Sequence, residues 1–197
     1  MKVNLLIIIL AIHACTPLSQ SSQNSVSNPK VLSLTDRVYE PPIRTVQLHP
    51  DLTGPGASLE PSVTAIGEWN LILQFDDLST QRDNFYARII HCQYDWTKST
   101  LADLDFMTQF NEFPITNFEF STDTHVPYVH YWFAVPPVKR PGNYVLAVYR
   151  NGNKDDLILT RRFMVHDRKI ILQGERNLIG AGSVAQRNQQ LNFTVSY

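Results

Sequence analysis

Apolar and polar residues alternate along much of the chain from Arg37 onward, and a period of two is typical of half-buried β-strands. Successive side chains of a strand point to opposite faces of its sheet. In residues 69–76 this pattern predicts one buried face, formed by Trp69, Leu71, Leu73 and Phe75. The segment 191–197 alternates strictly as well, so it is also predicted to be a strand.

Two segments, 131–135 and 144–149, are apolar at almost every position, which is typical of central strands covered on both faces. Asn151-Gly152-Asn153 follows the second segment, and these residue types favour tight turns. A further β-rich segment, 157–165, comes next. Residues 143–165 are therefore predicted to form a hairpin.

A succession of short strands and turns predicts an all-β fold, an immunoglobulin/fibronectin-like two-sheet β-sandwich over residues 37–166. One helical patch, Leu101 to Phe110, is short enough for a crossing turn or a 3₁₀ segment. After a boundary near His166, residues 167–197 are expected to begin a second β domain, which is incomplete.

The first residues have the layout of a secretion signal, with Met1-Lys2, an apolar block at 5–12 and then Ala14-Cys15. The apolar block is shorter than the roughly 20 residues that span a bilayer. We interpret residues 1–14 as a lipoprotein-type signal peptide and Cys15 as the lipidation site. The alternative is ordinary cleavage and a soluble periplasmic product. Residues 15–36 are rich in Ser, Asn and Gln, so they are expected to form a flexible tether.

Charge and cysteine content exclude several classes of protein. The 17 basic and 18 acidic residues are interspersed and give a net charge of −1, so the chain lacks the basic surface of a nucleic-acid-binding protein. Cys15 and Cys92 are the only cysteines. If Cys15 is acylated, Cys92 has no intramolecular partner and no disulfide framework forms.

The neighbours His91 and Cys92 are the most suggestive pair for nucleophilic catalysis. On a strand they point to opposite faces, so they cannot form the hydrogen bond that a Cys–His dyad requires. Cys92 is instead predicted to be a core residue. The buried face of this segment is expected to consist of the even positions Tyr86, Ile90, Cys92, Tyr94 and Trp96.

The sequence does not support a metal site or a catalytic carboxylate pair either. His125 and His130 lack further ligands at zinc-like intervals, so structural or surface roles are favoured. Asp76-Asp77 is interpreted as a solvated strand end rather than a glycosidase pair. No phosphate-binding, hydrolase or zinc-protease motif is present in the sequence. We therefore predict no enzyme activity, no catalytic residue, no metal, no cofactor and no small-molecule substrate.

Several blocks resemble the opening part of the type IX secretion system plug protein family. Three of them are Tyr39-Glu40-Pro41-Pro42-Ile43-Arg44-Thr45-Val46-Gln47-Leu48, Leu73-Gln74-Phe75-Asp76-Asp77-Leu78 and Phe85-Tyr86-Ala87-Arg88-Ile89-Ile90-His91-Cys92-Gln93-Tyr94-Asp95-Trp96. Others lie at 110–112, 115–121, 130–131, 142–146 and 159–165, in the same order, so the resemblance runs from about Arg37 to Tyr197.

The resemblance implies a first domain that is an immunoglobulin-like sandwich, in the envelope of a Bacteroidetes-type bacterium. It implies that the protein binds an outer-membrane translocon barrel of SprA type and closes its periplasmic opening. A lipid on Cys15 would hold it at the inner leaflet of the outer membrane. Family members continue beyond a point like Tyr197, so a fragment or a truncated reading frame is expected.

Four residues are candidates for partner binding: Arg161, Arg162, Tyr128 and Trp132. Neighbouring arginines on a strand face opposite ways, and the alternative roles are pairing with a buried acid or covering an aromatic ring. Two other functions stay open. One is a glycan-binding or adhesive immunoglobulin-like module, since exposed aromatic rings stack on sugars. An envelope enzyme is the least favoured.

Overall fold

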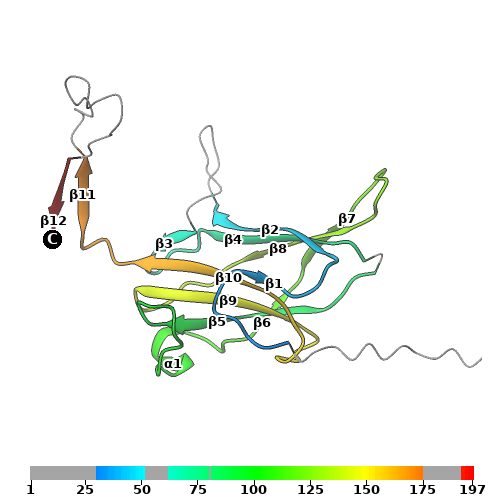
Figure 1. The fold of residues 1–197 in the computed structure, drawn as a ribbon, viewed down its shortest axis with the longest axis horizontal. Helices are drawn as coiled ribbons and strands as arrows, with labels where there is room; N and C mark the ends of the chain where they lie inside the picture. The colour runs from blue at the N-terminus through cyan, green and yellow to red at the C-terminus, as the bar shows by residue number, and fades with distance from the viewer. Residues whose placement is uncertain (1–29, 52–61, 80, 175–191) are drawn as a thin grey trace, which may run out of the picture.

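Two β-sheets pack face to face in the computed structural model, which describes residues 30–51, 62–79, 81–174 and 192–197 (Figure 1). Almost all strand pairs are antiparallel, so the prediction of an all-β two-sheet sandwich is confirmed. Among the residues that the structure describes, we find no helix with the length and apolar character of a membrane span.

The first sheet has the order β1-β10-β9-β5-β6, and β3 pairs in parallel with the end of β10. Its strands are β1 (Arg37–Val38), β3 (Val63–Ala65), β5 (Phe85–Cys92), β6 (Phe113–Ile115), β9 (Gly142–Arg150) and β10 (Leu157–His166). The predicted hairpin is confirmed, because β9 and β10 pair along their length. Asn151 and Gly152 follow β9 with φ of 52° and 72°, a conformation that Asn and Gly tolerate best.

The second sheet has the order β2-β4-β8-β7. Its strands are β2 (Ile43–Pro50), β4 (Leu71–Asp77), β7 (Asn117–Phe120) and β8 (Val129–Ala134). Its inner face is buried and its outer face meets solvent, so the prediction that residues 131–135 are covered on both faces is wrong. Trp69 precedes β4 and is 60% exposed, so it was wrongly assigned to the buried face of residues 69–76.

An aromatic cluster joins the two sheets at the centre of the core. The rings of Phe75 and Tyr131 stack with centroids 5.1 Å apart, and Phe85 meets both edge-on at 5.4 and 4.9 Å. These offset and edge-to-face arrangements are the favoured ones for aromatic rings. The Tyr131 hydroxyl accepts from the backbone N–H of Asp83 at 3.0 Å, so the polar end of the ring is also satisfied.

The outer face of the first sheet carries a second apolar cluster: Ile90, Cys92, Val145, Ala147 and Leu157. Cys92 is 2% exposed, which confirms it as a core residue. The expected burial of the even positions of 85–96 is wrong in part, because the odd residues Phe85, Ala87 and Ile89 form the main core and Tyr94 is 89% exposed. With both faces of β5 covered, the sequence pattern cannot tell one face from the other.

Residues 30–40, which we call the strap, cross the outer face of the first sheet. Leu34 and Tyr39 pack against the second cluster, and the carbonyl of Thr35 accepts from the Thr160 hydroxyl at 2.7 Å. Residues 30–36, expected to be tether, therefore contact the sandwich. The rest of the expected tether, the signal peptide 1–14 and Cys15 lie outside the described residues.

Two smaller elements complete the fold. The helical patch is a single turn, α1 (Asp103–Phe106), whose Phe106 packs near Tyr144. After β10 ends at His166, β11 (Ile171–Gly174) and β12 (Phe193–Ser196) pair antiparallel beyond one end of the sandwich (Figure 1).

We predict that Asn111 stabilises β5 by acting as a substitute strand. Its buried side chain accepts from the Ile89 N–H at 2.9 Å and donates to the Ile89 carbonyl at 2.7 Å, beyond the last pair between β5 and β6. Asn111→Ala leaves both backbone groups unsatisfied, so the free energy of unfolding should fall by about 2–4 kcal/mol in urea titrations. The exposed Asn117→Ala is the control, and equal losses for the two variants would contradict this role.

Candidate functional site

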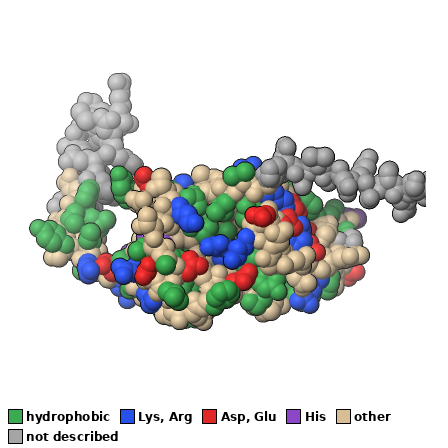
Figure 2. Space-filling view, turned by 90° about the horizontal axis from the view of Figure 1, so that it is seen from below, with side chains coloured by type: hydrophobic (Ala, Val, Ile, Leu, Met, Phe, Trp, Pro, Cys, Tyr) green, Lys and Arg blue, Asp and Glu red, His purple; other side chains and the backbone are tan. Residues whose placement is uncertain are grey.

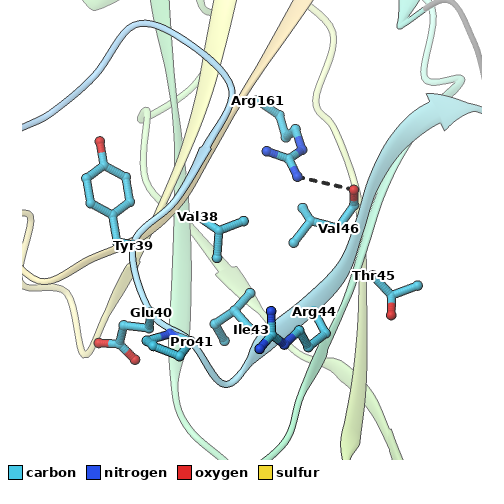
Figure 3. Close-up of a pocket in the computed structure, with 9 residues that line it drawn as sticks. All are labelled: Val38, Tyr39, Glu40, Pro41, Ile43, Arg44, Thr45, Val46 and Arg161. Carbon is cyan, nitrogen blue, oxygen red and sulfur yellow. Dashed lines mark hydrogen bonds between the residues drawn. The ribbon is translucent and has the colours of Figure 1, made fainter.

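A groove lies along one open edge of the sandwich, between β1 of the first sheet and β2 of the second (Figure 3). Its volume is about 530 Å³, and the lining residues are Val38, Tyr39, Glu40, Pro41, Ile43, Arg44, Thr45, Val46 and Arg161. In the described chain, β1 pairs only with β10 and β2 only with β4. The groove is therefore bounded by two strands that each have one unpaired edge.

A β-bulge shapes the wall formed by β2. The register between β2 and β4 shifts between Arg44 and Gln47, and Thr45 has a φ of 50°. This conformation is strained for a β-branched residue and persists only where the surroundings enforce it. At the bulge, the Val46 carbonyl faces the groove and accepts from Arg161 (Figure 3).

Arg161 reaches across the groove from β10 to β2. Its Nη2 donates to the Val46 carbonyl at 3.3 Å and its Nη1 to the Thr160 carbonyl at 3.1 Å. No carboxylate lies within 4.0 Å of this guanidinium among the described residues. Burial lowers the pKa of Arg161, an effect that the nearby charge of Asp36 opposes. The charge is thus partly desolvated but not ion-paired.

Arg162 lies on the opposite face of β10, as the alternation of side chains predicts. Its guanidinium carbon is 4.3 Å from the centre of the Trp96 ring, and its Nε donates to the Leu34 carbonyl at 2.7 Å. Trp96 has a φ of 67°, an uncommon conformation for a bulky side chain. Arg162 therefore covers an aromatic ring and fixes the strap, which was one of the alternatives for this pair.

A third arginine, Arg150 at the end of β9, is fully paired. It donates to Glu40 at 2.7 Å, to Asp83 at 2.7 Å and to Asp156 at 3.0 Å. Lys30 also contacts Glu40 and Asp156. Burial alone would raise the pKa of Glu40, but the hydrogen bonds and charges of Arg150 and Lys30 outweigh it and hold that pKa below its ordinary value. This network ties both ends of the strap to the sandwich.

Tyr128 and Trp132 belong to the other side of the molecule. Trp132 is half-buried on the outer face of the second sheet and stacks on His130, with ring centroids 5.8 Å apart. Tyr128 lines a separate shallow hollow between β7 and β8. The four candidate residues therefore lie in the groove, under the strap and on the second sheet, and do not form one site.

The remaining candidates take structural positions. His130 Nδ1 lies 2.7 Å from the Asp76 carboxylate, while Asp77 is buried and accepts from the Ser79 N–H at 3.0 Å. The interpretation of Asp76-Asp77 as a solvated strand end is therefore wrong for Asp77. Within the described ranges, no group of three or more His, Cys, Asp or Glu residues is arranged to hold a metal ion.

His91 and Cys92 point to opposite faces of β5. The His91 ring is 5.0 Å from Tyr144 and near α1, whereas Cys92 packs in the second cluster. Burial lowers the pKa of His91 and raises that of Cys92. Both shifts disfavour the charged forms, and the geometry separates the two side chains as the sequence predicts.

Charged side chains of both signs are mixed over the face of the sandwich shown in Figure 2. This agrees with the interspersed charges of the sequence. The groove is thus distinguished by the pairing state of its arginine rather than by a broad basic surface.

Comparison with known proteins gives a family and a fold. The family model described as "Type 9 secretion system plug protein 1st domain" matches residues 43–167. A crystal structure of a hypothetical protein from Parabacteroides merdae has a similar fold, with a TM-score of 0.71 and 24% sequence identity. The similarity covers 84% of this chain but only 42% of that one, so this chain spans less than half of its length. A search of curated proteins found no match.

We predict that the Arg150 network makes stability depend on pH. Because the pKa of Glu40 is held below its ordinary value of 4.5, its contribution is complete above that pH and is lost as the pH falls through the lowered pKa. At neutral pH, Glu40→Gln should reduce the free energy of unfolding by about 1–2 kcal/mol. As the pH falls from 4.5 through the lowered pKa of Glu40, the stabilities of wild type and variant should converge in urea titrations.

The exposed Glu119 provides the control, because Glu119→Gln should follow the wild type at every pH. A difference between wild type and Glu40→Gln that stays constant down to strongly acidic pH would contradict the role of the network.

Proposed function

Because the chain belongs to the type IX secretion system plug protein family, we propose that it binds the outer-membrane translocon of this system and closes its periplasmic side without catalysing a reaction. Membership of the family supports involvement in type IX secretion and a location in the cell envelope. The proposal adds a specific partner, a barrel of SprA type, and a mechanical role.

One observation carries this proposal: the family match spans the folded sandwich almost from end to end. It begins at Ile43, the first residue of β2, and ends one residue after β10. The similarity to plug proteins is therefore a similarity of the whole two-sheet body, including its aromatic core, and not of one local motif.

Closing a pore requires a body that keeps its shape under load. Protein interiors are packed about as densely as organic crystals, so a sandwich with a continuous core resists deformation. Here the core runs through both sheets, and the strap and Trp96 cover the outer face of the first sheet. These features support a steric role, which needs a binding surface and a rigid shape.

The outer face of the second sheet is the surface we propose for docking on the barrel. It is not covered by another element of the described chain, and Trp132 lies on it beside His130. Tryptophan is enriched at the energetic centres of protein interfaces. Tyr128, at the end of the same sheet, would contribute at the rim.

We also propose that a lipid on Cys15 holds the protein at the inner leaflet of the outer membrane. One acyl chain anchors only marginally, whereas two or more anchor stably. The strap begins at Lys30, so residues between the lipid and the strap would set the distance between membrane and sandwich.

Recovery of the translocon barrel with affinity-tagged full-length protein from the native host tests the proposal. Wild type should retain the barrel, and Trp132→Ala should reduce the recovered amount about tenfold or more, because a buried interface tryptophan is removed. Quantitative mass spectrometry of the eluate measures the ratio.

Trp69→Ala is the matched control, since Trp69 is 60% exposed but lies outside this face, before β4. It should leave recovery unchanged. If wild-type full-length protein retains no barrel under conditions that preserve the translocon, the proposal is wrong.

A further inference from the structure

We propose that the groove between β1 and β2 binds an extended, acidic segment of another polypeptide, with a carboxylate of that segment paired to Arg161. The identity of this other polypeptide rests on the proposed function, within which it is a component of the secretion machinery.

Comparison of two arginines shows what the groove lacks. Arg150 meets three carboxylates within 3.0 Å, whereas the described chain places none within 4.0 Å of Arg161. The nearby Asp36 already accepts the Arg162 backbone N–H at 2.7 Å. Asp36 therefore supplies some opposite charge but no ion pair, and an incoming carboxylate would relieve the part of the desolvation cost of Arg161 that remains.

Arg161 also has N–H donors that make no hydrogen bond to the described chain. A guanidinium carries five N–H donors in a planar fork, and Arg161 uses two of them on neutral carbonyls at 3.1 and 3.3 Å. Hydrogen bonds between arginine and carboxylate are shorter and about twice as strong, and they are frequently bidentate. A carboxylate therefore competes effectively with the Val46 carbonyl. The exposed Arg44 lines the same groove and adds a second positive charge.

The walls of the groove favour an extended ligand. β1 and β2 are edge strands of different sheets, and each leaves one edge unpaired within the described part of the chain. Extended peptides bind such edges through main-chain hydrogen bonds, while pockets for alternate side chains provide specificity. At the bulge of β2, the Val46 carbonyl is directed to Arg161 rather than to a strand of the described chain. Backbone pairing would thus bring an acidic side chain to the guanidinium.

Binding of a short peptide of alternating Thr and Val with one central Glu, compared with its Gln counterpart, tests the inference on the full chain. Amide NMR shifts report weak binding and identify the residues affected. The Glu peptide should shift Arg44 and Val46 and bind at least about tenfold more tightly than the Gln peptide. Arg161→Met should abolish this preference, and Arg161→Lys should retain it only in part because lysine lacks the fork.

Arg82→Met is the control, because Arg82 is exposed and stacks over Phe118, away from the groove. It should bind like wild type. Shifts confined to other residues, equal affinity for both peptides, or no shift at millimolar peptide would each overturn the inference. So would a dimer that dissociates on Arg161→Met, since the occupant would then be a second copy of this chain.

The two proposals fail separately. Loss of barrel recovery with intact peptide binding would remove the proposed translocon partner and leave the groove as a peptide site. Barrel recovery without any peptide binding would overturn only the groove.

Discussion

Burial of both faces of the first sheet is the constraint on which the rest of this structure depends. Residues 144–149 of β9 are buried, on the core side by the second sheet and on the other side by the strap and Trp96. The strap stays in place because Glu40 at one end binds Arg150, Lys30 at the other end binds Asp156, and Arg162 binds the Leu34 carbonyl between them. Placing the strap also places β1, since β1 lies within it and pairs with β10. The same contacts that cover the first sheet therefore also position β1, which forms one wall of the groove.

The two adjacent arginines of β10 perform related tasks on opposite faces. Arg161 donates to the carbonyl of Val46, the residue after Thr45, and Arg162 stacks on Trp96; Thr45 and Trp96 both have a positive φ. Each arginine thus lies beside a backbone conformation that persists only where the surrounding structure enforces it. The two arginines differ in their access to a ligand. Arg162 is enclosed between the Trp96 ring and the strap, whereas Arg161 faces an open groove. Edge strands are commonly protected by bulges and inward-pointing charges, and the same devices make this edge selective for an acidic chain.

The sequence predicted the strands best where one face of the strand is buried and the other is exposed to solvent. In β4, strict alternation identified Leu71, Leu73 and Phe75, and the Asn151-Gly152 pair identified the hairpin. It failed where both faces are covered, because Ile89 and Ile90 are equally apolar and their order does not indicate which faces the core. The groove could not be predicted from the sequence for a different reason. Arg161 was singled out by its neighbour, but its carbonyl partner on β2 is 115 residues away in sequence. Such contacts follow from the packing of sheets and leave no local pattern.

The strap also constrains how the chain acquires its shape. Thr35 bonds to Thr160 and Asp36 to Arg162, contacts separated by 125 and 126 residues. Contacts this distant in sequence incur a large loop-closure entropy and form slowly compared with hairpins. The strap precedes the other elements of the sandwich in the sequence, whereas β10, the strand that receives it, follows every other strand of the two sheets. Until β10 forms, the strap lacks the strand that anchors it over the apolar cluster of Ile90 and Cys92, and apolar surface exposed during such an interval favours aggregation.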